Sequence, residues 1–318
     1  MFLADKYKDD NNSGCISGSM IKSNSNNIVR GSLRINESMA KHTTWRAGGV
    51  VDEYFEPADL EDLCHFLADL DPDRSLLWVG LGSNLLVRDG GFRGTVIAYT
   101  KGLNKLRVSD NGTVMAEAGV TCAKVARLTA KHGFTGAEFL VGIPGSIGGA
   151  LAMNAGAFGS ETWNIVTQVE TVDRTGNIKN HLPDSFSIGY RSVQFQAEEW
   201  FVSAKLKLQP DHDKNTEKLI KELLAKRTAS QPIGQPSCGS VFRNPPNNFA
   251  AKLIDQCGLK GTRIGNAAIS DKHANFIINL GEATAGDIET LIDYTRQTVY
   301  EKFKINIIPE VRIIGEHT

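Results

Sequence analysis

The run of residues 142–159 constrains this chain more than any other segment. Six of its eighteen residues are glycine, about three times the rate of the whole chain, and none of its side chains is charged. Glycine admits positive φ and lets another group approach the backbone, but it costs chain entropy and weakens helices and strands. We therefore expect a loop whose backbone N–H groups bind an anion or a phosphate-bearing cofactor.

A second glycine-rich loop strengthens this expectation. It comprises Gly80, Leu81, Gly82, Ser83 and Asn84, and it follows an apolar run at 76–79. Two such loops in one chain point to a phosphate-bearing cofactor held between them. The alternative, that both loops are only tight turns, stays open on spacing alone.

Two common phosphate-binding motifs do not fit these loops. A P-loop requires Gly-x-x-x-x-Gly-Lys-Ser/Thr, and no glycine here precedes a Lys-Ser/Thr pair in that frame. The dinucleotide fingerprint Gly-x-Gly-x-x-Gly fails because Leu85 stands where its third glycine belongs, and no acidic residue is well placed for a ribose. A dinucleotide whose diphosphate is bound by two separate loops, one from each of two lobes, remains.

Composition excludes several other classes of protein. The net charge is −1 and no basic stripe is visible, so we expect no nucleic-acid partner. No apolar run approaches the roughly 18 residues of a membrane span. The five cysteines form no Cys-x-x-Cys pair, which argues against a disulfide framework or a zinc ribbon. We expect a reduced, cytoplasmic protein without a metal site.

Hydrophobic periodicity predicts an α+β fold and not the regular alternation of a doubly wound sheet. Residues 1–30 are rich in Asn, Ser and Asp and are predicted to be a disordered tail. The polar stretch 210–213 is the main expected boundary. Helices are predicted near 60–70, 121–132, 219–224, 249–257 and 288–303, and strands near 76–80, 95–99, 113–118, 166–173, 178–182, 200–208 and 311–314.

Six segments spread over residues 40–314 are together specific. They are HTTWRAGG at 42–49, VGLGSNLLV at 79–87, the run 142–159, CGSVFRNP at 238–245, SDKHANF at 270–276 and IPEVR at 308–312. With these segments in this order, the chain resembles the UDP-N-acetylenolpyruvoylglucosamine reductase (MurB) family. The long tyrosine-bearing loop of one branch is absent, so the chain is similar to the shorter, type II branch. The resemblance implies a two-lobed FAD-binding region of the vanillyl-alcohol-oxidase (PCMH) type at 31–210, with lobes at about 31–98 and 99–210. It also implies a C-terminal α/β substrate-binding domain at 211–318.

The same resemblance implies a reaction. In that family NADPH reduces a non-covalently bound FAD, and a hydride then passes to the double bond of UDP-N-acetylglucosamine enolpyruvate. The product, UDP-N-acetylmuramate, is a peptidoglycan precursor. Charge that develops on the substrate carboxylate requires a cation or a donor nearby, and the resulting carbanion requires an acid within reach. We expect a monomer.

Matching the family motifs residue by residue implies roles for individual side chains. Ser240 corresponds to the proton donor, Arg191 to the arginine at the substrate carboxylate and Glu310 to its acidic partner. Without the motifs, each would be read as an ordinary turn serine, surface arginine or solvated glutamate, and the sequence gives no direction for the pKa shift of Glu310. The implied FAD-binding residues are Arg46, Gly80, Gly82, Ser83, Asn84, Leu85, Gly142, Gly145, Ser146, Gly149, Asn154 and Gly156, and the implied substrate-binding residues are Tyr190, Arg227, Asn244 and His273.

Two other functions remain possible on the sequence alone, and the sequence also suggests that one cysteine affects turnover. An oxidase of the same flavin fold would often tether its flavin to a Gly-Gly-His histidine, whereas this chain has Gly48-Gly49-Val50. A nucleotide-sugar-binding protein without catalysis would be favoured by missing catalytic positions, yet all three are present. Cys238 lies two residues before Ser240, so both side chains share a face if that segment is extended, and a thiol reagent is then expected to slow turnover.

Overall fold

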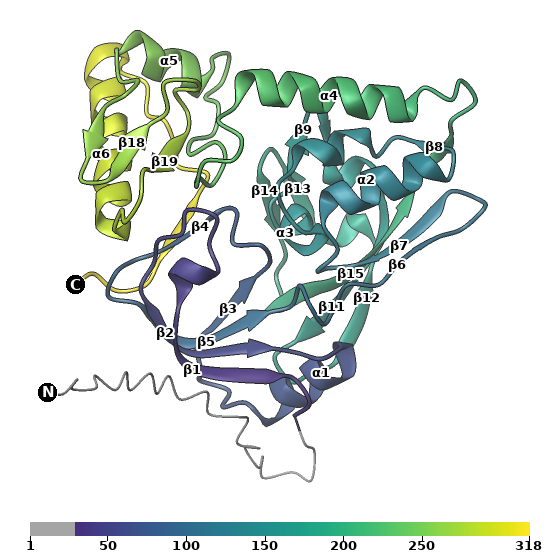
Figure 1. Ribbon diagram of the computed structural model, residues 1–318. Helices are drawn as coiled ribbons and strands as arrows, with labels where there is room; N and C mark the ends of the chain where they lie inside the picture. The colour runs from purple at the N-terminus through teal and green to yellow at the C-terminus, as the bar shows by residue number, and fades with distance from the viewer. Residues whose placement is uncertain (1–28) are drawn as a thin grey trace, which may run out of the picture.

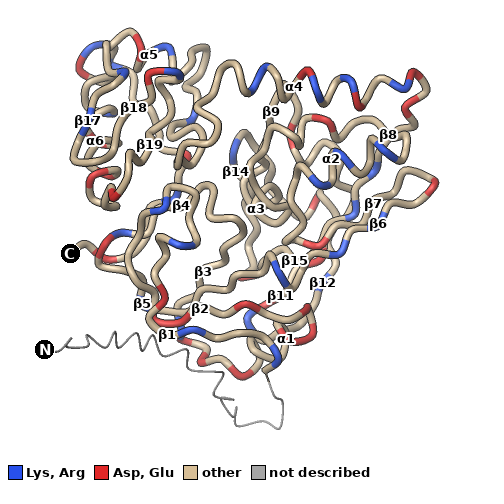
Figure 2. The backbone as a smooth tube through the Cα atoms, viewed as in Figure 1, with Lys and Arg blue, Asp and Glu red and all other residues tan. Residues whose placement is uncertain are grey.

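The computed structural model describes residues 29–318 and shows two β-sheet lobes and a smaller C-terminal domain (Figure 1). The predicted tail at 1–30 lies outside the described residues except for its last two. Among the described residues no helix combines the length and the apolar character needed to cross a membrane. Acidic and basic positions are interspersed along the described chain (Figure 2), in keeping with the small net charge.

The first lobe is built on a four-stranded mixed sheet in the order β1-β2-β5-β3. β1 and β2 are antiparallel, whereas β5 runs parallel to both β2 and β3. Helix α1 packs on this sheet, and it begins at Asp59, whose side chain accepts a hydrogen bond from the backbone N–H of Asp62. The bounds are β1 Ser32–Ser38, β2 Val50–Glu56, α1 Leu60–Asp69, β3 Leu76–Val79 and β5 Phe92–Ala98.

The second lobe is a five-stranded antiparallel sheet in the order β12-β11-β15-β7-β6. Val202, Ala204 and Leu206 of β15, alternate residues of the strand predicted at 200–208, are buried. Helices α2 and α3 supply side chains to the core on that side of the sheet. The bounds are β6 Leu106–Val108, β7 Thr113–Glu117, α2 Cys122–Lys131, α3 Ile147–Ala152, β11 Val166–Asp173, β12 Ile178–His181 and β15 Glu199–Lys207.

The C-terminal domain contains a three-stranded sheet, β17-β18-β19, with α5 and α6. Its last strand, β20, leaves this domain and pairs in parallel with β4 of the first lobe, with Arg312 opposite Leu85 and Ile314 opposite Val87. The bounds are β4 Leu85–Val87, α5 Ala250–Gln256, β17 Arg263–Ile264, β18 Ala267–Ile269, β19 Ile277–Asn279, α6 Ala285–Phe303 and β20 Arg312–Ile314.

Helix α4, Thr216–Ser230, connects the second lobe to the C-terminal domain (Figure 1). It follows the predicted boundary at 211, yet its buried Ile220 and Leu223 belong to the core of the second lobe. The smaller elements are η1 Met39–Lys41, β8 Phe134–Thr135, η2 Glu138–Gly142, β9 Gly156–Ala157, β10 Ser160–Glu161, η3 Thr162–Asn164, η4 Pro183–Ser185, β13 Ser187–Gly189, β14 Ser192–Gln194 and β16 Gln209–Pro210.

The glycine-rich run contains a short helix, and the expectation of a loop throughout was wrong. α3 begins after Ser146, whose side chain accepts a hydrogen bond from the N–H of Gly149. Ile147, Ala150 and Leu151 are then fully buried. Burial of these apolar side chains outweighs the weak helix propensity of the intervening glycines.

Trp45 joins the first lobe to the C-terminal domain. Its side chain is fully buried, and its indole N–H donates to the backbone carbonyl of Ile277 at 2.7 Å. The amide nitrogen of Asn279 in turn donates to the backbone carbonyl of Trp45 at 2.9 Å. These buried hydrogen bonds join segments that are far apart in the chain.

We expect the substitution Trp45→Phe to lower the free energy of unfolding by about 1–3 kcal/mol more than a matched control, because it leaves the Ile277 carbonyl buried without its donor. The control is Trp78→Phe, since the buried indole nitrogen of Trp78 has no hydrogen-bond partner among the described residues. Urea denaturation of both variants measures the difference. Equal losses of stability would show that the Trp45 hydrogen bond contributes nothing specific.

Candidate active site

The two glycine-rich loops lie against each other where the two lobes meet. A Cβ added to Gly80 would lie 2.5 Å from the hydroxyl oxygen of Ser146 and 2.9 Å from that of Tyr99. The hydroxyls of Ser146 and Tyr99 are themselves 3.3 Å apart and buried. Glycine at position 80 therefore lets one loop pack directly on the other, and Ser146 is occupied as the cap of α3.

The backbone at Gly145 and Gly149 is open to a bound group. A Cβ at Gly145 would come no closer than 3.6 Å to its surroundings, with the Ser83 hydroxyl at 3.7 Å, and one at Gly149 would meet only the Ser146 hydroxyl at 3.7 Å. Open backbone beside a serine hydroxyl, at the junction of two lobes, fits the phosphate portion of a dinucleotide.

Three other predicted FAD-binding positions make backbone or packing contacts within the protein. Gly82 has φ of +62°, and its carbonyl accepts a hydrogen bond from the N–H of Thr44. Leu85 is buried in β4 opposite Arg312. Gly142 lies under the ring of Phe158, since a Cβ there would be 2.6 Å from a ring carbon. None of these three positions offers a polar side chain to a ligand.

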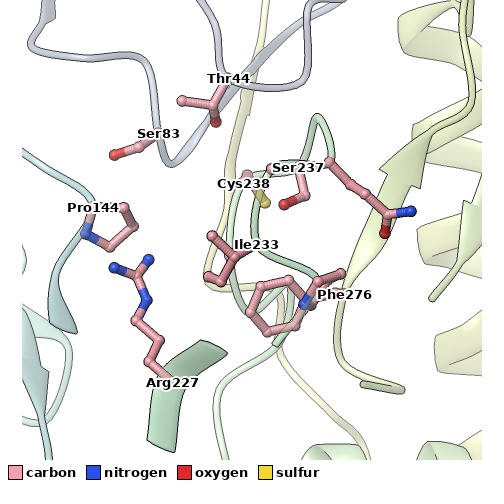
Figure 3. Close-up of a pocket in the computed structure, with 12 residues that line it drawn as sticks. Thr44, Ser83, Pro144, Arg227, Ile233, Ser237, Cys238 and Phe276 are labelled. Atoms are coloured by element: carbon pink, nitrogen blue, oxygen red, sulfur yellow. The ribbon is translucent and has the colours of Figure 1, made fainter. Parts of the chain in front are cut away.

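A pocket beside the loops gathers residues from every part of the fold (Figure 3). Arg227, near the end of α4, extends its guanidinium toward Pro144 of the glycine-rich run. The guanidinium also donates to the backbone carbonyl of Val141 and to the side chain of Gln231, and burial lowers its pKa. The pocket is lined by Thr44, Ser83, Pro144, Arg227, Pro232, Ile233, Gly234, Gln235, Ser237, Cys238, Gly239 and Phe276.

Arg191 and Glu310 form an ion pair between the second lobe and the segment that precedes β20. The Nε atom of Arg191 lies 3.2 Å from Oε1 of Glu310, and both side chains are less than one fifth exposed. Arg191 occupies the two-residue turn of the β13–β14 hairpin with φ of +53°. The neighbouring Tyr190 is half exposed, and its ring lies 5.3 Å from the guanidinium carbon.

Burial raises the pKa of Glu310, and the nearby guanidinium groups of Arg191 and Arg243 only partly oppose this rise. The backbone of Glu310 is fixed on both sides. Its N–H donates to the carbonyl of Val241 at 2.7 Å, and its carbonyl accepts from the amide nitrogen of Asn84 at 3.0 Å. The side chain of Asn84 therefore holds the backbone of Glu310, whereas the sequence predicted that Asn84 contacts the cofactor.

Ser240 is half buried and directly precedes Val241, the residue that pairs with the backbone of Glu310. Asn275 fixes this segment, because its side chain accepts from the N–H of Phe242 at 3.0 Å and donates to the Phe242 carbonyl at 2.8 Å. The structure therefore brings Arg191 and Glu310 into direct contact and holds the Ser240 segment beside them. The positioning role of Asn275 was not predicted, although the residue lies within one of the six family segments.

The remaining predicted positions differ in what their side chains contact. Asn244 accepts a hydrogen bond from the N–H of Ala250 at the start of α5. His273 accepts at Nδ1 from the N–H of Asn275, and burial lowers its pKa. Arg46 is exposed, with φ of +55°. Asn154 is buried within the second lobe.

The structure does not meet the condition on which the expectation for Cys238 depends. Gly239 has φ of +80°, so the segment from Cys238 to Ser240 is not extended and the alternation argument fails. The cysteine side chain is buried, and burial together with the charge of Glu310 raises the pKa of its thiol well above the ordinary value. Its reactive thiolate form is therefore disfavoured.

Comparisons with known proteins agree with this geometry. Residues 51–181 match the model of the FAD binding domain family, and residues 231–314 match that of the UDP-N-acetylenolpyruvoylglucosamine reductase C-terminal domain. The UDP-N-acetylenolpyruvoylglucosamine reductases of Methylococcus capsulatus and Alkalilimnicola ehrlichii are 53% and 54% identical over 90% and 91% of this chain, and 94% and 97% of their own lengths. The crystal structure of the Thermus caldophilus enzyme superposes with a TM-score of 0.76 at 30% identity, covering 89% of this chain and 98% of that one.

We expect Glu310→Gln to raise the free energy of unfolding at neutral pH. The folded-state pKa of Glu310 is raised, so its contribution to stability is fully present below the unfolded-state pKa and is lost as pH rises through the folded-state value. Glutamine has no charge to desolvate, so the variant avoids the free-energy cost of burying a carboxylate. Chemical denaturation across pH 4–8 should show the advantage of the variant shrinking as the pH falls toward 4. A difference that stays constant with pH would contradict desolvation of the carboxylate as the cause.

Proposed function

The chain belongs to the UDP-N-acetylenolpyruvoylglucosamine reductase family, and we propose that Arg191, Ser240 and Glu310 carry its reaction. Membership confirms the resemblance found in the sequence, with its two-lobed FAD-binding fold and C-terminal domain. The reaction is the FAD-mediated reduction of UDP-N-acetylglucosamine enolpyruvate by NADPH in peptidoglycan synthesis. The observation that carries our assignment is the Arg191–Glu310 ion pair held beside the Ser240 segment.

We propose that FAD is held by the open backbone at Gly145 and Gly149 and by the hydroxyl of Ser83. These residues lie where the two lobes meet, so a diphosphate bound there would contact both lobes. When bound, FAD supplies the hydride-transfer chemistry. The protein's part is to orient the reacting groups and to stabilise the charge that develops.

Arg191 is suited to bind and polarise the substrate carboxylate. Reduction of the enolpyruvyl double bond places negative charge on the carbon beside that carboxylate and on its oxygens. A guanidinium held in a fixed orientation stabilises this charge without reorganising during the reaction. Glu310 contacts the same guanidinium, and its buried carboxyl group keeps the arginine from turning away.

Ser240 is suited to deliver the proton that completes the reduction. A serine hydroxyl is a weak acid, but a carbanion is a strong base, so transfer is feasible when the hydroxyl is positioned within reach and then reprotonated. The two hydrogen bonds between the Asn275 side chain and the Phe242 backbone restrict the segment that carries this hydroxyl.

We assign the nucleotide-sugar part of the substrate to Arg227, Tyr190, Asn244 and His273. Arg227 extends a cation into the pocket, which suits a diphosphate. His273 accepts at Nδ1, so its Nε2 carries the proton and can donate to a ligand oxygen. Asn244 has its carbonyl oxygen engaged with α5, which leaves its amide nitrogen to contact substrate.

Two further statements belong to this proposal. We propose that the protein is a monomer and that it acts in the cytoplasm, where its nucleotide substrates are made and where its cysteines would remain reduced. Sedimentation of the purified protein tests the first statement, and a dimer would contradict it.

We expect FAD to be bound without a covalent link, because the Gly-Gly-His context typical of tethered flavins is replaced by Gly48-Gly49-Val50. Precipitation of the purified protein with acid should leave the yellow flavin in the supernatant. Colour that remains in the washed precipitate would favour a tethered flavin of the oxidase type.

We expect Ser240→Ala to lower turnover by about 10²- to 10⁴-fold, the usual contribution of a positioned general acid. Reduction of the enzyme-bound flavin by NADPH should proceed at an unchanged rate, because that half-reaction does not use the proton donor. Stopped-flow absorbance separates the two half-reactions. The control is Ser230→Ala at the exposed end of α4, where the hydroxyl contacts only backbone carbonyls of its own helix. Full turnover by Ser240→Ala would remove this residue from the mechanism.

A further inference from the structure

Protein groups use both hydrogen-bond donors of the Asn154 side chain. Its amide nitrogen donates to a carboxylate oxygen of Glu161 at 2.8 Å and to the backbone carbonyl of Gly189 at 3.1 Å. Its amide oxygen accepts from the N–H of Trp163 at 3.2 Å. An asparagine amide has two N–H donors, and both are used, so none remains for a cofactor. The residue is only 2% exposed.

These contacts hold the hairpin that presents Arg191. Gly189 is the last residue of β13, two positions before Arg191. The guanidinium of Arg191 also returns to this region, because it donates to the backbone carbonyl of Asn154 at 3.3 Å and to that of Gly156 at 2.7 Å. Asn154 therefore holds both the start of the turn and the group that the turn carries.

The backbone conformations of Asn154 and Arg191 also favour this placement of the guanidinium. Asn154 and Arg191 have φ of +44° and +53°, in the left-handed region that most residues avoid and that asparagine tolerates. At Gly156 an added Cβ would lie 3.0 Å from Nη1 of Arg191. A side chain at position 156 would therefore crowd the guanidinium.

We propose that residues 154–156 are a clamp that positions Arg191 against Glu310, and that Asn154 is a positioning residue and not a cofactor-binding one. The glycine-rich run then has two parts. Its first part, 142–149, faces the other glycine-rich loop, and its second part, 154–156, holds Arg191 in place. This inference rests on the proposed role of Arg191 in the reaction.

The sharpest test is Asn154→Gly, because glycine accepts the left-handed backbone while the amide is lost. FAD affinity and the rate of flavin reduction by NADPH should stay within about 2-fold of the unmodified protein. The kcat for complete turnover should fall about 10- to 100-fold, the effect expected when a catalytic group moves by about an ångström. The matched control is Asn180→Gly on the exposed strand β12, where turnover should not change. A loss of FAD affinity that parallels the loss of activity would overturn the proposal, and so would unchanged turnover.

A double-mutant cycle with Arg191→Lys distinguishes positioning from an independent role. If Asn154 acts through Arg191, Asn154→Gly should slow the Arg191→Lys enzyme by less than about 3-fold. Multiplicative effects in the double variant would overturn the clamp. If Arg191→Lys alone left turnover unchanged, the proposed function of Arg191 would fail, whatever Asn154 does.

An exchange of the amide and the carboxylate between positions 154 and 161 covers the case in which Asn154→Gly does not fold. Asn154→Asp places a carboxylate oxygen against Glu161 and the Gly189 carbonyl, where a donor is required, so kcat should fall. Adding Glu161→Gln restores a donor to that contact, and kcat should recover at least about 3-fold while FAD affinity remains constant. Absence of recovery in the folded double variant would overturn the proposal that this hydrogen bond positions Arg191.

Discussion

The parallel pairing of β20 with β4 determines where Glu310 lies in this fold. Glu310 lies two residues before β20, and the amide of Asn84, directly before β4, holds its backbone carbonyl. One strand pair thus brings a glutamate from the C-terminal part of the chain to a glycine-rich loop of the first lobe. The second lobe supplies Arg191, so the ion pair forms where all three parts of the fold meet.

The electrostatics of this junction favour function over stability. Burial raises the pKa of Glu310 although Arg191 contacts it and Arg243 is nearby. A buried ion pair rarely repays the desolvation of its members, so its value lies in orientation. Among the described residues the buried Nε atom of Arg243 has no hydrogen-bond partner, whereas that of Arg191 faces Oε1 of Glu310 at 3.2 Å. A cluster in which every polar atom had a protein partner would be more stable, but it would leave no donor for a ligand.

Much of the architecture could be predicted from the sequence because its signals are local. α1, α2 and α6 have clear apolar stripes, and the alternation in β15 reports one buried face. The helix α3 was missed because its formation depends on burying Ile147 and Leu151 against the second sheet, a tertiary effect. The motifs singled out Arg191, Ser240 and Glu310, which the structure places close together, but they could not separate ligand contacts from internal ones. Asn84 and Asn154 match a cofactor-binding segment, yet both amides hold other parts of the protein, and only the three-dimensional contacts reveal this.

The strand pair that locates Glu310 also has a consequence for biosynthesis. β4 is made early, but its partner is synthesised much later, after the second lobe and nearly all of the C-terminal domain. The first sheet and the five-stranded sheet can form on the ribosome, whereas the junction cannot close until residues 310–314 are free of the exit tunnel. Until these residues are available the Arg191–Glu310 ion pair cannot form, and a chain that stops before residue 310 lacks it altogether.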